Sequence, residues 1–277
     1  MVKPKNKPLV SVLVCSYNAE QFILPTLRSV LDQTYREMEV LIWDNASHDL
    51  TTQLINELSQ KDKRLQLYKS EKNIGPYAGL NRLLEKAKGE YIAINDHDDI
   101  WHSAKLEKQI AYLEQNPGYT GCGSAIINWY EKYNTTFYRS QPVRSDIAWH
   151  TSLVFRNGGY RYDASVPVGT DFYFMKNILS KNKKVIYNSQ EPMVMRRIFK
   201  DSSNLSGKWM KKAPVSSIFK LKIGLFDRLA LLNRRLFSQN WVEWMVVQFY
   251  KNNIPKKYEN YKIELDQINT TCSISKV

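Results

Sequence analysis

Two aspartates two residues apart follow a strand-like segment in the first half of the chain. Asp96 and Asp98 belong to the run Asn95–Asp99, directly after Glu90–Ile94. Alternate residues of an extended chain point to the same side, so the two carboxylates face one way. Converging carboxylates repel each other unless a cation or hydrogen-bond donors lie between them, and their hard oxygens suit Mg²⁺ or Mn²⁺ shared with substrate phosphates. A polar turn that caps the next helix, expected at 103–115, is the alternative that this spacing leaves open.

The elements that would position these acids alternate between strand and helix. Strand-like runs occupy Leu9–Cys15, Glu39–Trp43, Arg64–Tyr68 and Glu90–Ile94, and helical apolar spacing occupies 20–33, 51–59 and 77–88, with Gly89 as a cap. Such alternation predicts an α/β fold with a parallel sheet, helices on both faces, and a ligand site at the carboxyl ends of the strands. The acids at 96 and 98 follow one of these strands, where a ligand site is expected.

The pattern changes from about residue 118. Longer, aromatic strands are expected at 119–130, 135–138, 147–155, 184–187 and 193–197, with a helix at 169–179. After residue 207 the spacing is helical again, and five leucines between 221 and 236 share one stripe with basic residues beside it. We expect the second half to form an acceptor region against the first, followed by a helical tail.

The composition excludes several classes of protein. The 277 residues are 43% hydrophobic and 24% charged, which is typical of a globular chain and not of a disordered one. The apolar runs are shorter than the roughly 18–20 residues that a membrane span needs. Three widely spaced cysteines give neither a disulfide framework nor a zinc-site spacing, and the N-terminus has no signal-peptide pattern. We therefore expect a cytosolic, reduced protein.

The net charge of +13 is unevenly distributed. Residues 208–262 hold twelve basic and three acidic side chains, a net charge of +9, whereas the preceding two hundred residues are nearly balanced. A basic excess of this size indicates nucleic acid, anionic lipid or a polyanionic substrate as a partner. Because no nucleic-acid recognition motif accompanies the charge, nucleic acid is not expected among the partners.

Several motifs in a fixed order resemble one enzyme family. They are SVLVCSYN at 11–18, QTY at 33–35, EVLIWDNASHD at 39–49, KNIGPYAGLN at 72–81 and GEYIAINDHDDIWHSAKLE at 89–107. With them the chain resembles the family 2 glycosyltransferases of the GT-A fold, closely over residues 8–116 and more loosely to about 197. The resemblance implies a nucleotide-sugar donor, a divalent metal and an inverting transfer. It also implies a GT-A domain at 1–207, with a Rossmann-like, mostly parallel sheet that is joined by mixed strands on the acceptor side. Within this domain, residues 8–116 form the nucleotide-sugar-binding half and residues 117–207 the acceptor half.

Residues for the donor follow from this resemblance. It implies that Ser16, Tyr17 and Asn18 lie against the nucleobase and ribose, that Asp44 binds the base, and that Asn73, Gly75, Asn81, His97 and Arg197 also bind the donor. For Asn81, a place at the start of a helix is an equal alternative. Asp96 is expected at the ribose or the metal, and Asp98 at the Mn²⁺ or Mg²⁺ that bridges the diphosphate, while Asp99 holds the loop.

The turn after the second strand departs from the family pattern. It reads Asp44-Asn-Ala-Ser47, so Asn45 and Ala46 stand where relatives carry an acid and a glycine.

The catalytic base is expected in the second half. Asp171 matches the family's catalytic acid, although Thr170 replaces the commoner glutamate before it, and a helix N-cap is its alternative role. In an inverting transfer such a carboxylate takes the proton of the acceptor hydroxyl as that oxygen attacks the sugar. Relatives often carry a further metal-binding histidine near residue 198. Here the segment 195–199 has none, so a water or phosphate takes that place or Arg196 and Arg197 neutralise the diphosphate.

Three further residues are candidates for the acceptor side. His150 resembles a histidine that relatives carry near donor and acceptor, and a purely structural histidine is an equal alternative. Trp101 and Trp149 could stack on a sugar face, although tryptophan is more often simply buried.

The tail at 208–277 is expected to be a basic, amphipathic helical region. A leucine stripe flanked by basic residues, together with three tryptophans, suits a helix on an anionic membrane surface. A helical cap packed on the catalytic domain is the alternative, and both can hold. The membrane reading places the protein in the cytoplasm, peripherally at the inner face of the cytoplasmic membrane.

The expected function is transfer of a sugar, with a UDP-sugar as donor, to a glycan or lipid-linked acceptor in bacterial surface-polysaccharide or lipopolysaccharide assembly. dTDP- or GDP-sugars are alternative donors. A nucleotidyltransferase would open with a glycine-rich, arginine-bearing phosphate loop, which Ser16-Tyr-Asn18 is not. A catalytically inactive nucleotide-sugar-binding protein of the same fold is the remaining alternative, and the acids at 44, 96, 98 and 171 argue against it.

Overall fold

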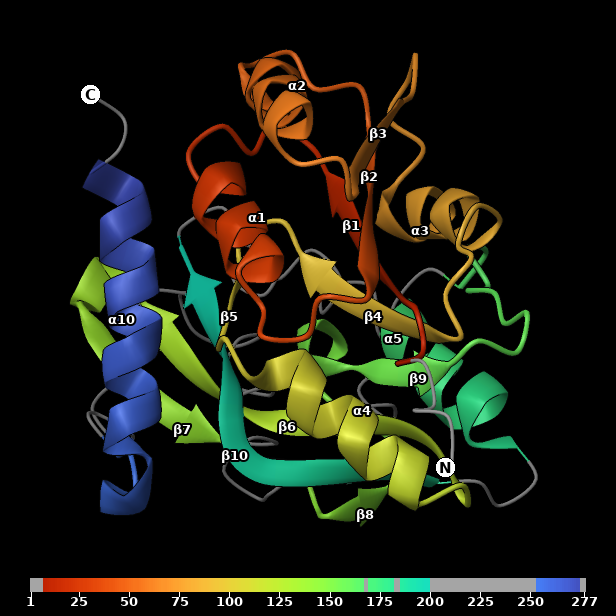
Figure 1. Cartoon of the computed structure of the whole chain (residues 1–277), viewed down its shortest axis with the longest axis vertical. Coiled ribbons are helices and arrows are strands. Elements are labelled where there is room, and N and C mark those ends of the chain that lie inside the picture. Colours follow the sequence, from red (N-terminus) through yellow and green to blue (C-terminus); the bar gives the residue numbers. More distant parts are fainter. Residues whose placement is uncertain (1–6, 167–168, 182–184, 200–252, 275–277) are drawn as a thin grey trace, which may run out of the picture.

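The computed structural model describes residues 7–166, 169–181, 185–199 and 253–274. In this part of the chain ten strands form one sheet (Figure 1). Four neighbouring strands at one side run parallel, in the order β3 (Leu65–Lys69), β2 (Met38–Asp44), β1 (Val10–Ser16) and β4 (Tyr91–Asp96). Because these strands are parallel, their carboxyl ends meet at one edge. The predicted parallel sheet of the first half is confirmed.

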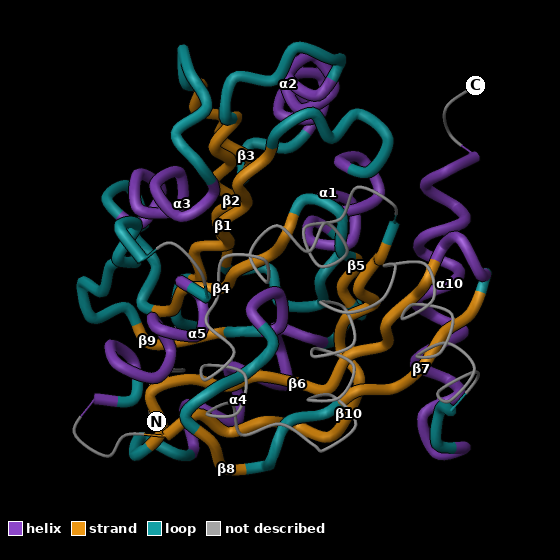
Figure 2. Tube along the Cα trace, turned by 180° about the vertical axis from the view of Figure 1, so that it is seen from behind, coloured by secondary structure: helices purple, strands orange, loops and turns teal. Residues whose placement is uncertain are grey.

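The strands of the second half continue the same sheet in mixed directions. β9 (Val154–Arg156) lies antiparallel between β4 and β6 (Tyr119–Tyr130), and β10 (Val185–Ile198) runs parallel to β6. Figure 2 shows β6 and β10 side by side across the lower part of the molecule. The short strands β5 (Ile100–Trp101), β7 (Thr135–Arg139) and β8 (Arg144–Ser145) pair antiparallel with β10, β6 and β10 respectively.

Helices cover both faces of the sheet, because its central strands are apolar on both sides. In β1, Val10, Val12 and Val14 face one core cluster, whereas Leu13 faces the other. The first cluster is covered by α1 (Ile23–Leu31), α2 (Thr51–Lys61) and α4 (Lys105–Gln115), and the second by α3 (Pro76–Leu84), α5 (Thr170–Tyr173) and the π-helix Phe174–Leu179. Continuous apolar runs are typical of such doubly covered strands.

The observed elements differ from the expected ones in several places. The segment 147–155 holds the 3₁₀ turn His150–Ser152 before β9, and not one long strand. The strands expected at 184–187 and 193–197 are parts of the single strand β10. α3 ends at Leu84, so Gly89 is not its cap. The two-residue strand β5 was not expected.

The C-terminal region is described only in part. After the 3₁₀ turn Lys256–Tyr258, helix α10 (Glu259–Ile274) lies beside α1, β5 and β10 (Figure 1). This segment of the predicted tail is helical and packs on the domain, as the capping alternative expects. The leucine stripe at 221–236 and the three tail tryptophans lie outside the described residues. Every helix in the described ranges is too short or too polar to cross a membrane.

Candidate active site

A cavity of about 810 Å³ opens where β1 and β4 end. Its walls come from segments far apart in the sequence, which include the end of β1, the start of α3, the acidic turn 96–99, the turn that contains His150, the start of α5, and the end of β10. This is the edge of an α/β sheet at which ligands bind, because the loops that follow parallel strands converge there. The lining includes most of the residues predicted for the site. They are Ser16, Tyr17, Asn18, Asn73, Asp96, His97, Asp98, Trp149, His150, Asp171 and Arg197.

The acidic turn supplies carboxylates at two depths. Asp96 ends β4, and its side chain is 45% exposed toward the cavity. Burial raises the pKa of Asp98, and the charge of Asp96 adds to this, although His97 and Arg196 oppose it. Asp99 is buried, and burial with the charges of both neighbouring acids raises its pKa well above the usual value. The carboxylates therefore repel each other, as expected for groups that await a cation.

His150 connects this turn to the opposite wall. Its Nδ1 lies 3.3 Å from Asp96 Oδ1, and its Nε2 lies 3.0 Å from the Tyr162 hydroxyl. Burial disfavours the imidazolium, but the hydrogen bond and charge of Asp96, with the charge of Asp171, raise the pKa of His150 above 6.5. Burial acts to raise the pKa of Asp96, but this hydrogen bond and the charges of His150, Arg196 and His97 together lower the pKa of that carboxyl. His150 is therefore part of the polar network of the cavity and not an isolated core histidine.

Asp171 lies in the first turn of α5 and lines the cavity. The residue that begins this helix as its N-cap is Gly169, so the alternative of Asp171 as the cap does not hold. Burial raises the pKa of the Tyr77 hydroxyl, and the negative charge of Asp171 adds to this effect. Tyr77 also packs at 5.4 Å against Tyr162. The carboxylate of Asp171 thus faces the same space as the acidic turn, beside two tyrosines.

The loop after β1 is fixed by hydrogen bonds to the turn that follows β2. Asn18 adopts a left-handed conformation with φ of 45°, its backbone N–H donates to Ser47 Oγ, and its side-chain oxygen accepts from the His48 N–H. Asparagine tolerates this backbone region better than most residues. Tyr17 beside it is 39% exposed, so an aromatic face is available at the cavity rim.

The turn around Asp44 is a structural support for this loop. The buried Asp44 carboxylate accepts hydrogen bonds from the Ser47 hydroxyl and N–H and from the Thr52 hydroxyl. Ala46, in the place of the family glycine, has a left-handed φ of 63°. Asn45 lines the cavity instead: its Nδ2 donates to Asn73 Oδ1, and its Oδ1 accepts from the Ile74 N–H. Asn45 is therefore the member of this turn that a donor can touch.

Four of the predicted site residues are outside the cavity lining: Asp44, Gly75, Asn81 and Trp101. For two of them the contacts favour the structural alternative that the sequence left open. The Asn81 amide is used up by the backbone of Tyr162, donating to its carbonyl and accepting from its N–H, so Asn81 positions a tyrosine and does not face the donor. Trp101 is fully buried, and its indole N–H donates to the Thr151 carbonyl, so no sugar can stack on it.

The two arginines of β10 have different environments. The positive charge of Arg196 favours the ionised forms of Asp96, Asp98 and Asp99, although burial still raises the pKa of the last two. This guanidinium therefore faces the acidic turn. Arg197 is almost fully buried, and its guanidinium lies 4.8 Å from the Phe22 ring centre and 5.1 Å from that of Trp129. Consecutive residues of a strand point to opposite faces, which explains the difference. Arg196 is therefore the better placed of the two for a diphosphate.

Comparison with known proteins identifies the family. The model of glycosyl transferase family 2 matches residues 11–197, more than half of the chain. The chain belongs to glycosyl transferase family 2. The matched range ends at Arg197 and so includes the acidic turn, Asp171 and the arginine pair, but not α10.

Relatives and solved structures agree with the family and the fold. An uncharacterized glycosyltransferase of Haemophilus influenzae is 34% identical over 68% of this chain and 58% of its own length. TuaG of Bacillus subtilis, a putative teichuronic acid biosynthesis glycosyltransferase, is 41% identical over 44% of this chain and 48% of its own. The chain thus matches only part of the length of these relatives.

Two more similar proteins are known by names or titles that state a substrate. The Escherichia coli glucosyltransferase WfaP, named as using UDP-Glc and GlcNAc-diphosphoundecaprenol, is 39% identical over 64% of this chain and 72% of its own. The mannosyltransferase PcManGT of Pyrobaculum calidifontis, solved with GDP-Man and Mn²⁺, superposes with a TM-score of 0.57 at 15% identity over 98% of this chain and 87% of its own. At this identity the structural match shows the fold alone.

The cavity of this family 2 protein has ligands for a divalent cation, but few. In the described ranges, no three histidine, cysteine or acidic side chains group closely enough to hold a metal by themselves. Asp96 and Asp98 offer hard carboxylate oxygens, and their mutual repulsion is what a cation would relieve. Mg²⁺ and Mn²⁺ are commonly held by one or two carboxylates together with substrate phosphates and water. The donor set therefore fits an ion that arrives with a diphosphate.

Sequence reasoning missed several residues of this site. Tyr77 and Tyr162 stand beside His150 and Asp171, and Phe22 stacks on Phe199 at 4.7 Å in the cavity wall. Tyr77 directly follows the Gly-Pro pair in the motif KNIGPYAGLN, which placed it near the donor. Tyr162 lies in an irregular segment without periodicity, so nothing in the sequence marked it.

Proposed function

We propose that the protein is a metal-dependent, inverting glycosyltransferase that uses the cavity at the carboxyl ends of β1 and β4. The observation that carries the proposal is the convergence of Asp96, Asp98 and Asp171 on one cavity of about 810 Å³. A cavity of this size suits a nucleotide sugar, since small-molecule sites measure about 300–1,000 Å³. Membership of glycosyl transferase family 2 supports the same reaction class.

The donor is proposed to lie across the loop after β1. Tyr17 and Asn18 would contact the nucleobase and ribose, and Asn45 and Asn73 would bound the same side of the nucleotide. Arg196 would face the diphosphate, which its position beside the three acids of the turn supports. We propose a UDP-sugar because WfaP, over 64% of this chain, is named for UDP-Glc.

The reaction is proposed as a direct displacement. The Asp171 carboxylate takes the proton of the acceptor hydroxyl while that oxygen forms its bond to the anomeric carbon. The bond between the anomeric carbon and the diphosphate oxygen breaks, and the diphosphate leaves with the electron pair. A cation held by Asp96 and Asp98, when bound, supplies charge stabilisation to that leaving group.

The chain's own residues organise this displacement. His150 bridges Asp96 and Tyr162, so one hydrogen-bonded network spans the donor side and the acceptor side. Trp149 also lines the cavity, and the Arg196 guanidinium lies 6.0 Å from the centre of its ring. These contacts would orient the acceptor hydroxyl toward the anomeric carbon, and orientation accounts for a large part of enzymatic rate enhancement.

The acceptor is proposed to be a growing glycan or lipid-linked saccharide of a bacterial surface polymer. The relatives WfaP and TuaG, whose names place them in such pathways, support this class. We further propose that residues 1–207 form the catalytic domain and that the basic region 208–277 brings it to an anionic membrane from the cytoplasmic side. The net charge of +9 over 208–262 supports that location.

A screen of nucleotide sugars tests the proposal. Full-length protein is incubated with each of a set of UDP-, dTDP- and GDP-sugars, with Mn²⁺ or with EDTA, and release of the nucleoside diphosphate is measured. We expect turnover of at least one donor with Mn²⁺, and loss of at least about 100-fold with EDTA or in Asp98→Ala, because the leaving group then keeps its charge uncompensated. Donor binding without turnover of any sugar would instead identify an inactive nucleotide-sugar-binding protein.

A further inference from the structure

Helix α10 packs directly behind the acidic turn of the cavity. Leu265 is fully buried in a cluster with Ile100 of β5 and Met195 of β10, and Ile268 packs against the same cluster. β5 immediately follows Asp99 in the chain, and Met195 precedes the arginine pair. The helix therefore contacts both β5, which follows the acidic turn, and β10, which carries the arginine pair. It lies outside the range that the family model matches.

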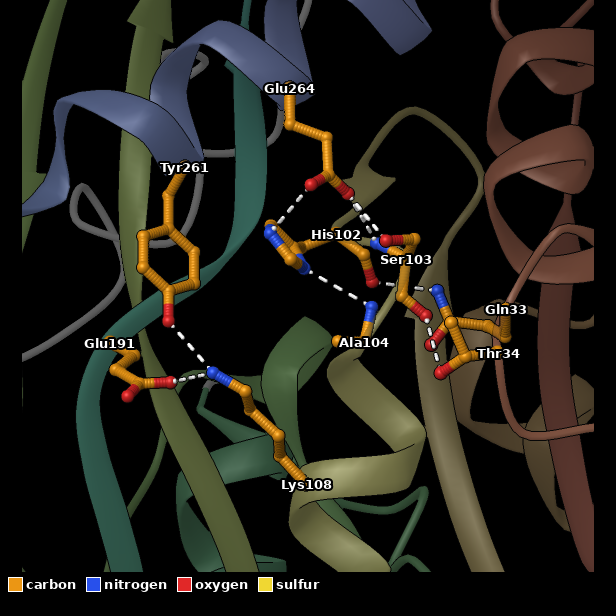
Figure 3. Close-up of polar contacts among 9 residues, drawn as sticks. All are labelled: Gln33, Thr34, His102, Ser103, Ala104, Lys108, Glu191, Tyr261 and Glu264. Atoms are coloured by element: carbon orange, nitrogen blue, oxygen red, sulfur yellow. Dashed lines mark hydrogen bonds and ion pairs between the residues drawn. The ribbon is translucent and has the colours of Figure 1, made fainter.

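Glu264 is the first polar link from α10 to the acidic turn. One carboxylate oxygen accepts hydrogen bonds from the Ser103 N–H at 2.9 Å and from the Ser103 hydroxyl at 2.6 Å. The other lies 2.9 Å from His102 Nε2 (Figure 3). Because His102 Nδ1 accepts the Ala104 N–H, the ring proton is on Nε2 and is donated to Glu264. Burial, against the opposing charge of Glu264, lowers the pKa of His102, which keeps this ring neutral.

The same segment is fixed from its other side by the residues that follow α1. The Gln33 side chain donates to the His102 carbonyl at 2.8 Å, and the Thr34 N–H donates to the Ser103 carbonyl at 3.0 Å. Both backbone and side-chain groups of His102 and Ser103 therefore have partners (Figure 3). Such saturation holds the exit of the acidic turn in one place, since each lost bond would leave a buried polar group unpaired.

Asn269 provides the second link. Its side-chain oxygen accepts a hydrogen bond from Arg197 Nη2 at 2.6 Å. The backbone N–H of Arg197 in turn donates to Asp99 Oδ1 at 3.0 Å, so one residue joins α10 to the acidic turn. The guanidinium lies between the rings of Phe22 and Trp129. Arg197 thus connects α10 to the acidic turn.

We propose that α10 is a positioning element of the donor site, and that Glu264 and Asn269 hold the acidic turn in its metal-binding geometry through His102, Ser103 and Arg197. The turn carries three acidic side chains within four residues, Asp96, Asp98 and Asp99, and like charges so close together repel each other. Anchoring it in advance lowers the reorganisation that cation binding requires. The link to metal affinity rests on the proposed function, whereas the link to the order of the turn does not.

Hydrogen–deuterium exchange tests the anchoring itself. In full-length Glu264→Ala and Asn269→Ala, we expect amides of residues 96–103 to exchange about tenfold faster than in the unmodified protein, because local opening becomes easier. Tyr261→Phe is the matched control, since it removes from the same helix only the hydroxyl that accepts from Lys108 (Figure 3). Glu264→Gln, which keeps an oxygen for Ser103, replaces Glu264→Ala if that variant does not fold. Exchange at 96–103 equal to that of the control would overturn the proposal.

Titration of the same variants with Mn²⁺ alone tests the consequence for the site. Free Mn²⁺ is measured by electron paramagnetic resonance, at a temperature where each variant remains folded. We expect the dissociation constant to rise about fivefold to tenfold in Glu264→Ala and Asn269→Ala and to stay unchanged in Tyr261→Phe. Equal affinity in all four proteins would overturn the positioning role. If the unmodified protein binds no Mn²⁺, the metal dependence of the proposed function fails, and the exchange measurement alone decides on the anchoring.

Discussion

Lys105 places an amine in the core of the protein. Its Nζ is fully buried, donates to Gln109 Oε1 at 2.9 Å, and lies 3.9 Å from the ring centre of Trp101. Burial lowers the pKa of this amine from 10.5 to about 7. The unfolded chain therefore binds a proton that the native state binds only weakly between about pH 7 and pH 10.5.

This difference predicts a pH-dependent stability. Because the unfolded state holds more protons in that window, the free energy of unfolding should rise with pH, by up to about 1.4 kcal/mol per pH unit. Lys105→Met should abolish this rise and should be the more stable protein near pH 7. Urea denaturation of both proteins from pH 7 to pH 9.5 measures it, with Lys61→Met, on an exposed position of α2, as control. Parallel stability curves for Lys105→Met and the unmodified protein would refute the buried-amine account.

At the scale of single residues, the sequence predicted the acids better than their surroundings. Asp96 and Asp98 were found because they follow an apolar strand, which places them at the edge where a sheet binds ligands. Trp101 was ambiguous because its type fits both a sugar platform and a core, and only the pairing of β5 with β10 buries it. Asn81 was ambiguous because its partner, Tyr162, is distant in sequence.

At the scale of elements, α3 approaches the sheet unusually closely. A Cβ at Gly79 would lie 2.6 Å from Cys15 Sγ and 2.8 Å from Trp43 Cδ1, so this glycine lets α3 pack on β1 and β2. Cys15 also lines the cavity, which makes this contact part of the support of the donor loop.

Gly79→Ala should therefore destabilise the protein although alanine favours helix. The gain in helix propensity is about 1 kcal/mol, and overpacking of a core contact costs about 1–3 kcal/mol. We expect a net loss of up to about 2 kcal/mol in the free energy of unfolding, measured by thermal and urea unfolding. Gly118→Ala, which meets no atom within 4 Å, should be nearly neutral. Equal changes in the free energy of unfolding for the two substitutions would show that the close approach of α3 to β1 and β2 does not contribute to stability.

Long apolar elements were predictable, whereas irregular ones were not. β1 and β2 are rich in aliphatic residues and β6 contains aliphatic and aromatic ones, and the positions of these strands agree with those expected to within a few residues. Two strands were expected where the structure has the single strand β10, which runs through Pro192, a residue that cannot donate to a ladder. The sheet accommodates the proline through register shifts on either side of it, which no local pattern indicates. β5 has only two residues and exists because β10 pairs with it.

At the scale of the whole molecule, charge and chemistry lie in different parts of the chain. The cavity gathers acids and Arg196 in the body, while residues 208–262 hold a net charge of +9. α10 belongs to the C-terminal region 208–277, and hydrogen bonds of Glu264 and Asn269 join it to the rest of the fold. We therefore propose that the C-terminal region serves both location and the order of the donor site. The sequence could predict its charge, but not the contacts that α10 makes across the fold.

The most direct test of the central claim compares donor binding with transfer in Asp171→Asn. The account assigns Asp171 to deprotonation of the acceptor, so binding of the nucleotide sugar with Mn²⁺, measured by calorimetry, should change less than about threefold. Transfer to the acceptor should fall by at least about 100-fold, since general-base catalysis contributes about 10²–10⁴ to a rate. Transfer by Asp171→Asn at the rate of the unmodified protein would contradict the account.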